Sequence, residues 1–248
     1  MDLVVPDVRK APRNVRSKVG HFVDDVGYNG FGHFLRIYRD AMAELPAFAD
    51  QTDVTTSFGS VRVYRFDGPA SGTPVLLLPG RAASTPMWRA NLASILQRRT
   101  VYSVDLLGEA GLSVQQQPIT SAEDQAQWLD EAIAGLGLGR VHVMGASIGG
   151  WTAVNCAVRR PGRIASLTLL DAVFTFARIP LRTLLFSAAM ASPVVPQRIR
   201  RMFLSWVSGG AAVDDSVPEA RLIAAATTDF TLRLPPPSAH RASRCVHR

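Results

Sequence analysis

Residues 141–151 read Val-His-Val-Met-Gly-Ala-Ser-Ile-Gly-Gly-Trp, and the pattern of this stretch decides the fold. β-prone residues lead into Gly145-Ala146-Ser147-Ile148-Gly149, and the segment that follows is compatible with a helix. Gly-x-Ser-x-Gly between a strand and a helix is typical of a nucleophile elbow, a sharp turn that lifts the serine hydroxyl clear of the backbone. A side chain at Gly145 or Gly149 would collide with the neighbouring strand or helix. The pattern predicts that Ser147 is a nucleophile, and the alternative is a Gly/Ser-rich loop without chemistry.

The composition is typical of a globular protein that can bury a full core. The chain has 248 residues, of which 47% are hydrophobic and 19% charged. The formal net charge is +7, and all but two of the 27 basic residues are arginines scattered along the sequence. A nucleic-acid or membrane surface needs clustered basic residues with aromatic residues or an amphipathic face. We therefore expect neither nucleic acid nor a membrane as a partner.

Cysteine usage and hydropathy predict a cytoplasmic protein. Cys156 and Cys245 are too few for a disulfide framework, and we expect Cys156 to be a buried, unreactive helix residue. The N-terminus has no apolar core of signal-peptide length. The most apolar later segment, 179–195, contains Arg182 and Pro193 and is shorter than the roughly 20 apolar residues of a spanning helix. Since no histidine has a second ligand at metal spacing, we expect no metal and no cofactor.

After an initial hairpin, the hydrophobic pattern alternates between strands and helices. Residues 1–30 are basic and turn-rich and predict a loose arm, whereas 31–45 predicts a helix that Pro46 ends. Strands are predicted over 54–58, 61–66, 74–80, 101–105, 141–144 and 164–170, and helices after Thr85-Pro86, over 121–135 and over 151–159. This order predicts an α/β fold with a mostly parallel sheet that helices cover on both faces.

Two helix starts carry capping signals. Thr85 places a hydroxyl before Pro86, which favours the first position of a helix. Thr120-Ser121-Ala122-Glu123 has the spacing of a capping box, in which Thr120 and Glu123 would satisfy each other's backbone N–H groups.

Residues from about 53 to 230 resemble the α/β-hydrolases, in particular the esterase and haloperoxidase-like branch with a helical cap. Four landmarks match in order: Leu78-Pro79-Gly80-Arg81 at the oxyanion loop, Asp105–Ser113 at the family's D-x-x-G-x-G-x-S loop with one extra residue, Gly145–Gly149 at the elbow, and Leu169-Leu170-Asp171 at the end of the strand before the cap. The resemblance implies a serine hydrolase for a small-molecule ester, lactone or related acyl substrate.

The resemblance also divides the chain. It implies an N-terminal arm and helix over 1–52, an incomplete hydrolase core over 53–171, and a helical cap over 172–232, followed by a tail, 233–248, that does not look native. Apolar periodicity predicts cap helices over 179–190, 198–207 and 218–228.

The resemblance assigns roles residue by residue. Ser147 would be the nucleophile, and the backbone N–H groups of Ile148 and Arg81 would stabilise the oxyanion. Asp105 and Ser113 are expected to order their loop rather than to react.

A general base for Ser147 is not evident. His142 lies five residues before Ser147, on the order of 16 Å along the same strand, so it cannot accept the serine proton. His240 or His247 could do so only if the tail folds back onto the site. Asp171 could be a displaced triad acid, but that role is empty without a histidine.

The tail shapes the functional expectation. Two further strand–helix units take about 50 residues, more than 233–248 supply. We interpret the tail as a shift of reading frame near Ser238, and the alternative is a natural short form completed by another chain. The chain would then be a truncated and inactive or very weak hydrolase, or a non-catalytic binding protein that keeps the pocket. The strand 164–170 would form an exposed sheet edge that favours self-association.

Overall fold

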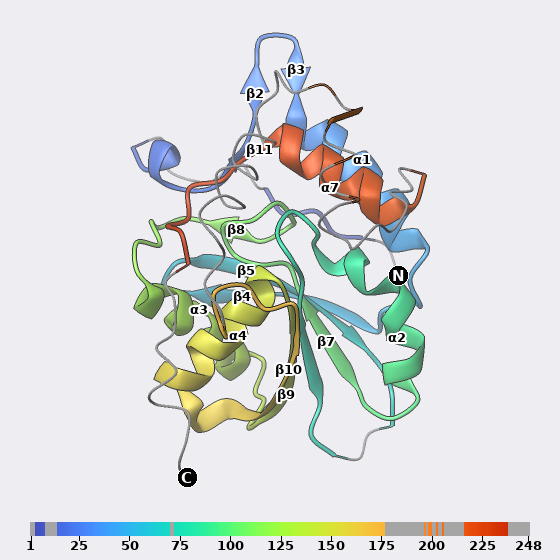
Figure 1. Cartoon of the computed structure of the whole chain (residues 1–248), viewed down its shortest axis with the longest axis vertical. Coiled ribbons are helices and arrows are strands. Elements are labelled where there is room, and N and C mark those ends of the chain that lie inside the picture. The colour runs from blue at the N-terminus through green and yellow to red at the C-terminus, as the bar shows by residue number, and fades with distance from the viewer. Residues whose placement is uncertain are drawn as a thin grey trace.

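A seven-stranded sheet forms the centre of the computed structural model (Figure 1). The structure describes residues 3–7, 14–69, 72–176 and 216–237, together with five isolated positions between 196 and 205. The strands run in the order β10, β9, β6, β7, β5, β4, and β8 pairs with β5. Their bounds are β4 Asp50–Thr56, β5 Gly59–Phe66, β6 Val75–Leu78, β7 Val101–Val104, β8 Val114–Gln115, β9 Val141–Ala146 and β10 Ile164–Leu170.

The strand directions confirm the predicted sheet. β10, β9, β6 and β7 pair in parallel, whereas β4 and β5 form the predicted antiparallel hairpin. Parallel pairing brings the carboxyl ends of β6, β7, β9 and β10 to one edge of the sheet. The landmark loops after β6, β7 and β9 therefore meet at the same end of the molecule.

Helices cover both faces of the sheet, as predicted. They are α1 Gly30–Ala43, α2 Arg89–Leu96, α3 Ala122–Gly135, α4 Ile148–Arg159 and α7 Pro218–Asp229, with short 3₁₀ turns at η1 Arg16–Lys18, η2 Thr85–Trp88 and η3 Pro161–Arg163. Leu76 and Leu78 pack into a core with α3 and α4, and Leu77 packs into a second core with α1, α2 and α7. Since successive strand residues point to opposite faces, β6 needs to be apolar throughout.

Two predicted helix caps were assigned to the wrong residue. The turn η2 includes Thr85, whose backbone N–H donates to Asp105 at 2.9 Å and whose hydroxyl accepts from Ser103, so Thr85 caps nothing. In the capping box of α3, the N-cap is Ser121 and its partner is Asp124. The same carboxylate accepts from the backbone N–H of Thr120 at 2.8 Å, so the box lies one residue later than predicted.

The prediction of a loose arm over 1–30 was wrong for residues 14–30. β1 His21–Phe22 pairs with β11 Phe230–Thr231, and β2 Asp24–Asp25 pairs with β3 Tyr28–Asn29. The Phe22 ring lies 5.0 Å from that of Phe34 and 5.0 Å from that of Phe230. Aromatic packing against partners distant in sequence therefore orders this segment, and short-range periodicity carries no signal of such contacts.

A helix is confirmed at the third position predicted for the cap: α7 lies beside α1 (Figure 1), and its membership of a cap stays a prediction. Nε of Arg89 in α2 lies 2.7 Å from Oε1 of Glu219 in α7, and this ion pair links the two helices. The predicted helices 179–190 and 198–207 lie outside the described residues, apart from isolated positions.

The capping box gives a prediction for stability. We expect Ser121→Ala to lower the free energy of unfolding by about 1 kcal/mol, because the backbone N–H of Asp124 loses its acceptor. Glu123→Ala is the matched control, since the ion pairs of Glu123 with Arg159 and Arg160 are exposed and stabilise little. Urea unfolding of both variants checks this, and an equal or larger loss in Glu123→Ala would contradict it.

Candidate active site

The turn that the sequence predicts as a nucleophile elbow lies between β9 and α4. Ser147 lies between the two elements with φ +50° and ψ −114°, a backbone conformation that residues other than glycine rarely adopt. Its backbone N–H donates to Leu170 O at 2.9 Å, and its carbonyl accepts from the N–H of Trp151 at 3.1 Å. Such a conformation costs about 1–3 kcal/mol and persists only where the surrounding structure imposes it.

The two elbow glycines are required by close packing, as the sequence predicts. A Cβ at Gly145 would stand 2.6 Å from Gly149 O. A Cβ at Gly149 would stand 2.2 Å from Leu78 O at the end of β6. Both distances are far below van der Waals contact, so α4 can approach the sheet only with glycine at these positions.

The hydroxyl of Ser147 is available for chemistry. It makes no hydrogen bond to any described residue, and the side chain is partly exposed. A Cβ at Gly80 would lie 3.6 Å from the Cβ of Ser147, so the turn that follows β6 lies directly against the elbow.

Two open backbone donors lie on the segments that flank Ser147. The N–H of Ile148 is in the first turn of α4, where no partner exists within the helix. Arg81 follows Gly80, and within the described residues neither the Ile148 N–H nor the Arg81 N–H has an acceptor. Open donors beside a nucleophile are what an oxyanion hole requires.

The turn after β6 is held in a strained shape by the loop after β7. Ala82 and Ser84 have φ of +58° and +52°. The Ser84 hydroxyl donates to Ala110 O at 2.6 Å, and the backbone N–H of Gly80 points to the sulfur of Met87 at 3.2 Å. These contacts hold Arg81 beside the elbow.

Asp105 and Ser113 order this loop, as predicted. The buried Asp105 carboxylate accepts from the backbone N–H of Leu112 at 2.8 Å and from the Tyr38 hydroxyl at 2.9 Å. The Ser113 hydroxyl donates to the Asp105 carbonyl and accepts from the N–H of Arg62 at 2.9 Å. Burial raises the pKa of Asp105, and its hydrogen bonds counter that rise.

Glu109 is a buried carboxylate that the sequence analysis did not single out. It is 5% exposed, its Oε2 lies 3.4 Å from the backbone N of Ala82, and its Oε1 lies 3.5 Å from Nε of Arg81. Burial raises its pKa, while the Arg81 guanidinium acts in the opposite direction. An acidic residue within the otherwise apolar run Leu106–Leu112 was the available signal.

None of the described histidines forms a hydrogen bond with Ser147. Nδ1 of His142 lies 2.8 Å from the Ser166 hydroxyl, in keeping with its exclusion as a base, and Nδ1 of His21 lies 2.9 Å from Val19 O. Nδ1 of His33 lies 2.7 Å from the buried carboxylate of Asp229. His240 and His247 lie outside the described residues.

The His33–Asp229 pair is a second contact that the sequence did not predict. Asp229 also accepts from the Tyr28 hydroxyl, so one buried carboxylate joins α1, the β2–β3 hairpin and the end of α7. The two partners are 196 positions apart in the sequence, and no local pattern links them.

Asp171 directly follows the residue that binds the elbow. Its side chain is exposed, its φ is +46°, and the carbonyl of the preceding Leu170 accepts from Ser147 N–H. Cys156 is buried in α4, as expected, and burial raises the pKa of its thiol to about 12.

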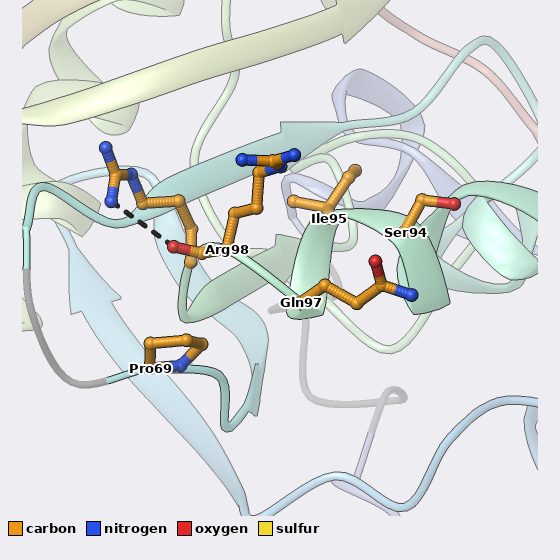
Figure 2. Close-up of a pocket in the computed structure, with 6 residues that line it drawn as sticks. Pro69, Ser94, Ile95, Gln97 and Arg98 are labelled. Carbon is orange, nitrogen blue, oxygen red and sulfur yellow. Dashed lines mark hydrogen bonds between the residues drawn. The ribbon is translucent and has the colours of Figure 1, made fainter.

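A surface cleft lies at the opposite end of the sheet. Figure 2 shows Pro69, Ser94, Ile95, Gln97 and Arg98 around it, and Arg99 completes the lining. These residues precede β6 and β7 or end α2, whereas Ser147 follows β9. The cleft is therefore separate from the candidate active site.

The described residues contain neither a candidate metal centre nor a candidate membrane span. Within them no group of three or more His, Cys, Asp or Glu side chains could hold a metal ion. No helix in the same part of the chain is long and apolar enough to cross a membrane.

Comparison with known families agrees with this geometry. A model of the alpha/beta hydrolase fold matches residues 73–242. The chain belongs to the α/β-hydrolase family. This confirms the resemblance to the α/β-hydrolases, and all four sequence landmarks lie inside the matched range.

Two proteins of Bacillus subtilis that are named carboxylesterases are similar to the chain. It is 28% identical over 154 residues to the uncharacterized carboxylesterase nap, an alignment that covers 62% of this chain and 51% of the relative. It is 24% identical over 176 residues to carboxylesterase YbfK, covering 71% and 58%. The chain thus spans about half the length of these relatives.

Solved structures support the α/β-hydrolase fold. Naproxen esterase (carboxylesterase NP) from Bacillus subtilis superposes with a TM-score of 0.74 at 21% identity, covering 86% of this chain and 73% of that one. Carboxylesterase CesB (YbfK) from the same species gives a TM-score of 0.70 at 23% identity, with the same coverage.

The packing at Gly149 gives a second prediction. We expect Gly149→Ala to lower the free energy of unfolding by about 3 kcal/mol or more, because the added methyl group would overlap Leu78 O. Gly139→Ala is the control, since its Cβ would meet no atom within 4 Å, and we expect a change of about 0.5 kcal/mol or less. Urea unfolding measures both variants. A loss of stability in Gly149→Ala as small as that in Gly139→Ala would show that the elbow tolerates a side chain.

Proposed function

We propose that Ser147 is the nucleophile of a hydrolase that acts on a small-molecule carboxylic ester, lactone or related acyl compound. The observation that carries the proposal is the strained Ser147, whose hydroxyl is unbonded and whose neighbours Ile148 and Arg81 offer open N–H groups. The similarity to proteins named carboxylesterases supports an ester as the substrate.

The chemistry follows from these groups. Oγ of Ser147 attacks the acyl carbon, and the carbonyl oxygen becomes an oxyanion that accepts hydrogen bonds from the N–H groups of Ile148 and Arg81. Collapse of this intermediate expels the alcohol and leaves an acyl-serine, which water then hydrolyses. Each of the two steps needs a group that accepts a proton from the attacking oxygen and returns it to the leaving oxygen.

No described residue is identified as the proton acceptor for Ser147. The described histidines have other partners, so Asp171, although adjacent to the elbow, has no described histidine to orient. We therefore propose that the base is His240, His247 or a residue of another chain, or that this chain lacks one and is inactive or very weak.

The activity of the 248-residue chain tests this proposal. Loss of the base costs about 10⁶-fold in turnover in a comparable site, equivalent to roughly 8 kcal/mol of barrier. We expect slow hydrolysis of a p-nitrophenyl ester, at about 10³–10⁴-fold over water, because the oxyanion donors remain. Ser147→Ala should then change the rate little. Stopped assays at several enzyme concentrations measure both rates.

Two results would change the proposal. Turnover at ordinary enzyme rates that Ser147→Ala abolishes would mean that His240, His247 or a partner chain supplies the base, and His240→Ala and His247→Ala would separate these cases. If an out-of-frame translation beyond Ser238 restores a strand, an aspartate and a histidine, the restored protein should gain several orders of magnitude in rate.

A non-catalytic binding protein is the second candidate. The observation that favours it is that no described histidine forms a hydrogen bond with Ser147. Such a protein would bind acyl compounds at the elbow without turning them over. Calorimetric titration of wild type with a p-nitrophenyl ester, with the released p-nitrophenol followed in parallel, distinguishes binding from turnover.

We also propose that the outer edge of β10 mediates association with a second copy of the chain. Among the described residues β10 pairs with β9 alone, and Leu170 at its end is 42% exposed. A row of unpaired backbone groups beside apolar side chains favours edge-to-edge pairing.

A charge on the edge strand tests this association. We expect wild type to sediment as oligomers at micromolar concentration and Thr168→Lys to shift the distribution towards monomer, because a lysine disfavours strand pairing. Thr227→Lys is the control, since Thr227 is exposed on α7, away from the edge. A monomeric wild type with a sharp cooperative melt would contradict the proposal.

A further inference from the structure

Glu109 occupies an unfavourable place for a carboxylate. Its side chain lies between the loop after β7 and the turn after β6 and is 5% exposed. Its Oε1 has no hydrogen-bond partner among the described residues, and its contacts with Arg81 and Ala82 are long, at 3.5 and 3.4 Å. A buried charge without close hydrogen bonds destabilises a protein.

Asp105 on the same loop provides the contrast. Its carboxylate accepts hydrogen bonds at 2.8–2.9 Å from the backbone N–H groups of Leu112 and Thr85 and from the Tyr38 hydroxyl. These bonds account for Asp105 as a structural residue. Glu109 makes no comparable bonds, so its burial needs another explanation.

The partners of Glu109 supply that explanation. Both belong to consecutive residues of the turn after β6, and Arg81 carries the second proposed oxyanion donor. Ala82 has the strained φ of +58°, so the peptide groups around it need an external contact to keep their orientation. Glu109 therefore contacts both the guanidinium of Arg81 and the backbone N of Ala82, the residue that follows Arg81.

We propose that Glu109 is a positioning residue that orients the backbone N–H of Arg81 towards the oxyanion formed on Ser147. The inference rests on the proposed function. Arg81 offsets the negative charge of Glu109, so that the carboxylate can hold the turn without repelling the oxyanion. Glu109 itself does not contact the reacting atoms.

The ionisation of Glu109 gives this role a distinct signature. Arg81 is the charged group that faces it, while the neighbouring Asp105 faces Tyr38 and Thr85. Because burial raises the pKa of Glu109, the folded protein favours the neutral acid more than the unfolded chain does. The stability contribution of the group is full at acid pH, below its ordinary pKa, and is lost as the pH rises through the raised pKa. Positioning needs the ionised form, so stability and reactivity change in opposite directions.

Glu109→Gln tests the proposal through a single-turnover reaction of Ser147. A p-nitrophenyl alkylphosphonate serves as the probe: Oγ of Ser147 forms a bond to phosphorus, the bond to p-nitrophenolate breaks, and the serine proton passes to solvent. We expect Glu109→Gln to react about tenfold more slowly at alkaline pH, less than the roughly 10²–10³-fold loss from removing an oxyanion donor. The ratio of wild-type to variant rates should fall towards one as Glu109 protonates at acid pH.

Stability provides the second readout. We expect Glu109→Gln to melt at a higher temperature than wild type at alkaline pH, with the difference vanishing at acid pH. Glu131→Gln is the matched control, because Glu131 of α3 binds Ser57 in the β4–β5 turn and should leave the phosphonate rate unchanged. An unchanged rate in Glu109→Gln, or a lower melting temperature with a rate ratio that does not vary with pH, would overturn the proposal.

The two proposals fail separately. If wild type reacts with the probe no faster than Ser147→Ala, the nucleophilic role of Ser147 in this chain fails, whereas the weak hydrolysis that the oxyanion donors alone support is unaffected. Amide hydrogen exchange of the peptide 80–88 then decides the role of Glu109, since Glu109→Ala should speed exchange there about tenfold if the contact holds the turn. Exchange equal to that of wild type would overturn the positioning role.

Discussion

The close approach of α4 to the end of β6 is the constraint on which the site depends. With 2.2 Å between Leu78 O and the place of a Cβ at Gly149, the helix can lie here only because that residue has no side chain. This contact fixes where α4 begins, and Ser147 is then confined to a strained backbone conformation between two rigid elements. The stability of the elbow is therefore supplied by the two cores on either side of the sheet.

Two buried carboxylates on one loop show how stability and chemistry divide between neighbouring positions. Asp105 is saturated with short hydrogen bonds and joins the loop to α1 and η2. Glu109 has only long contacts, both directed at the turn beside Ser147. A well-bonded polar network fixes the loop, and this allows the loop to carry a second charge in a place that is unfavourable for folding.

The sequence predicted the parts of the fold that local pattern determines. Apolar runs identified the strands. The elbow glycines identified the meeting of β9 and α4, because the close packing there excludes every residue that has a side chain. It did not predict Glu109 or the His33–Asp229 pair, since those depend on which loops meet in space. The caps of η2 and α3 were misassigned because neighbouring hydroxyl and acidic residues have nearly equal capping propensity, and backbone geometry selects between them.

The link between the N-terminal segment and α7 also bears on how the chain folds as it is made. His33 cannot reach Asp229, nor can β1 pair with β11, until residues 229–231 have left the ribosome. At synthesis rates of about 5–20 residues per second, the 196 intervening positions correspond to roughly 10–40 s. During that interval the aromatic face around Phe22 has no Phe230 to cover it. The segment around β1 therefore takes its final place only after β11 has been made, and until then the nascent chain offers chaperones an apolar surface that the folded protein hides.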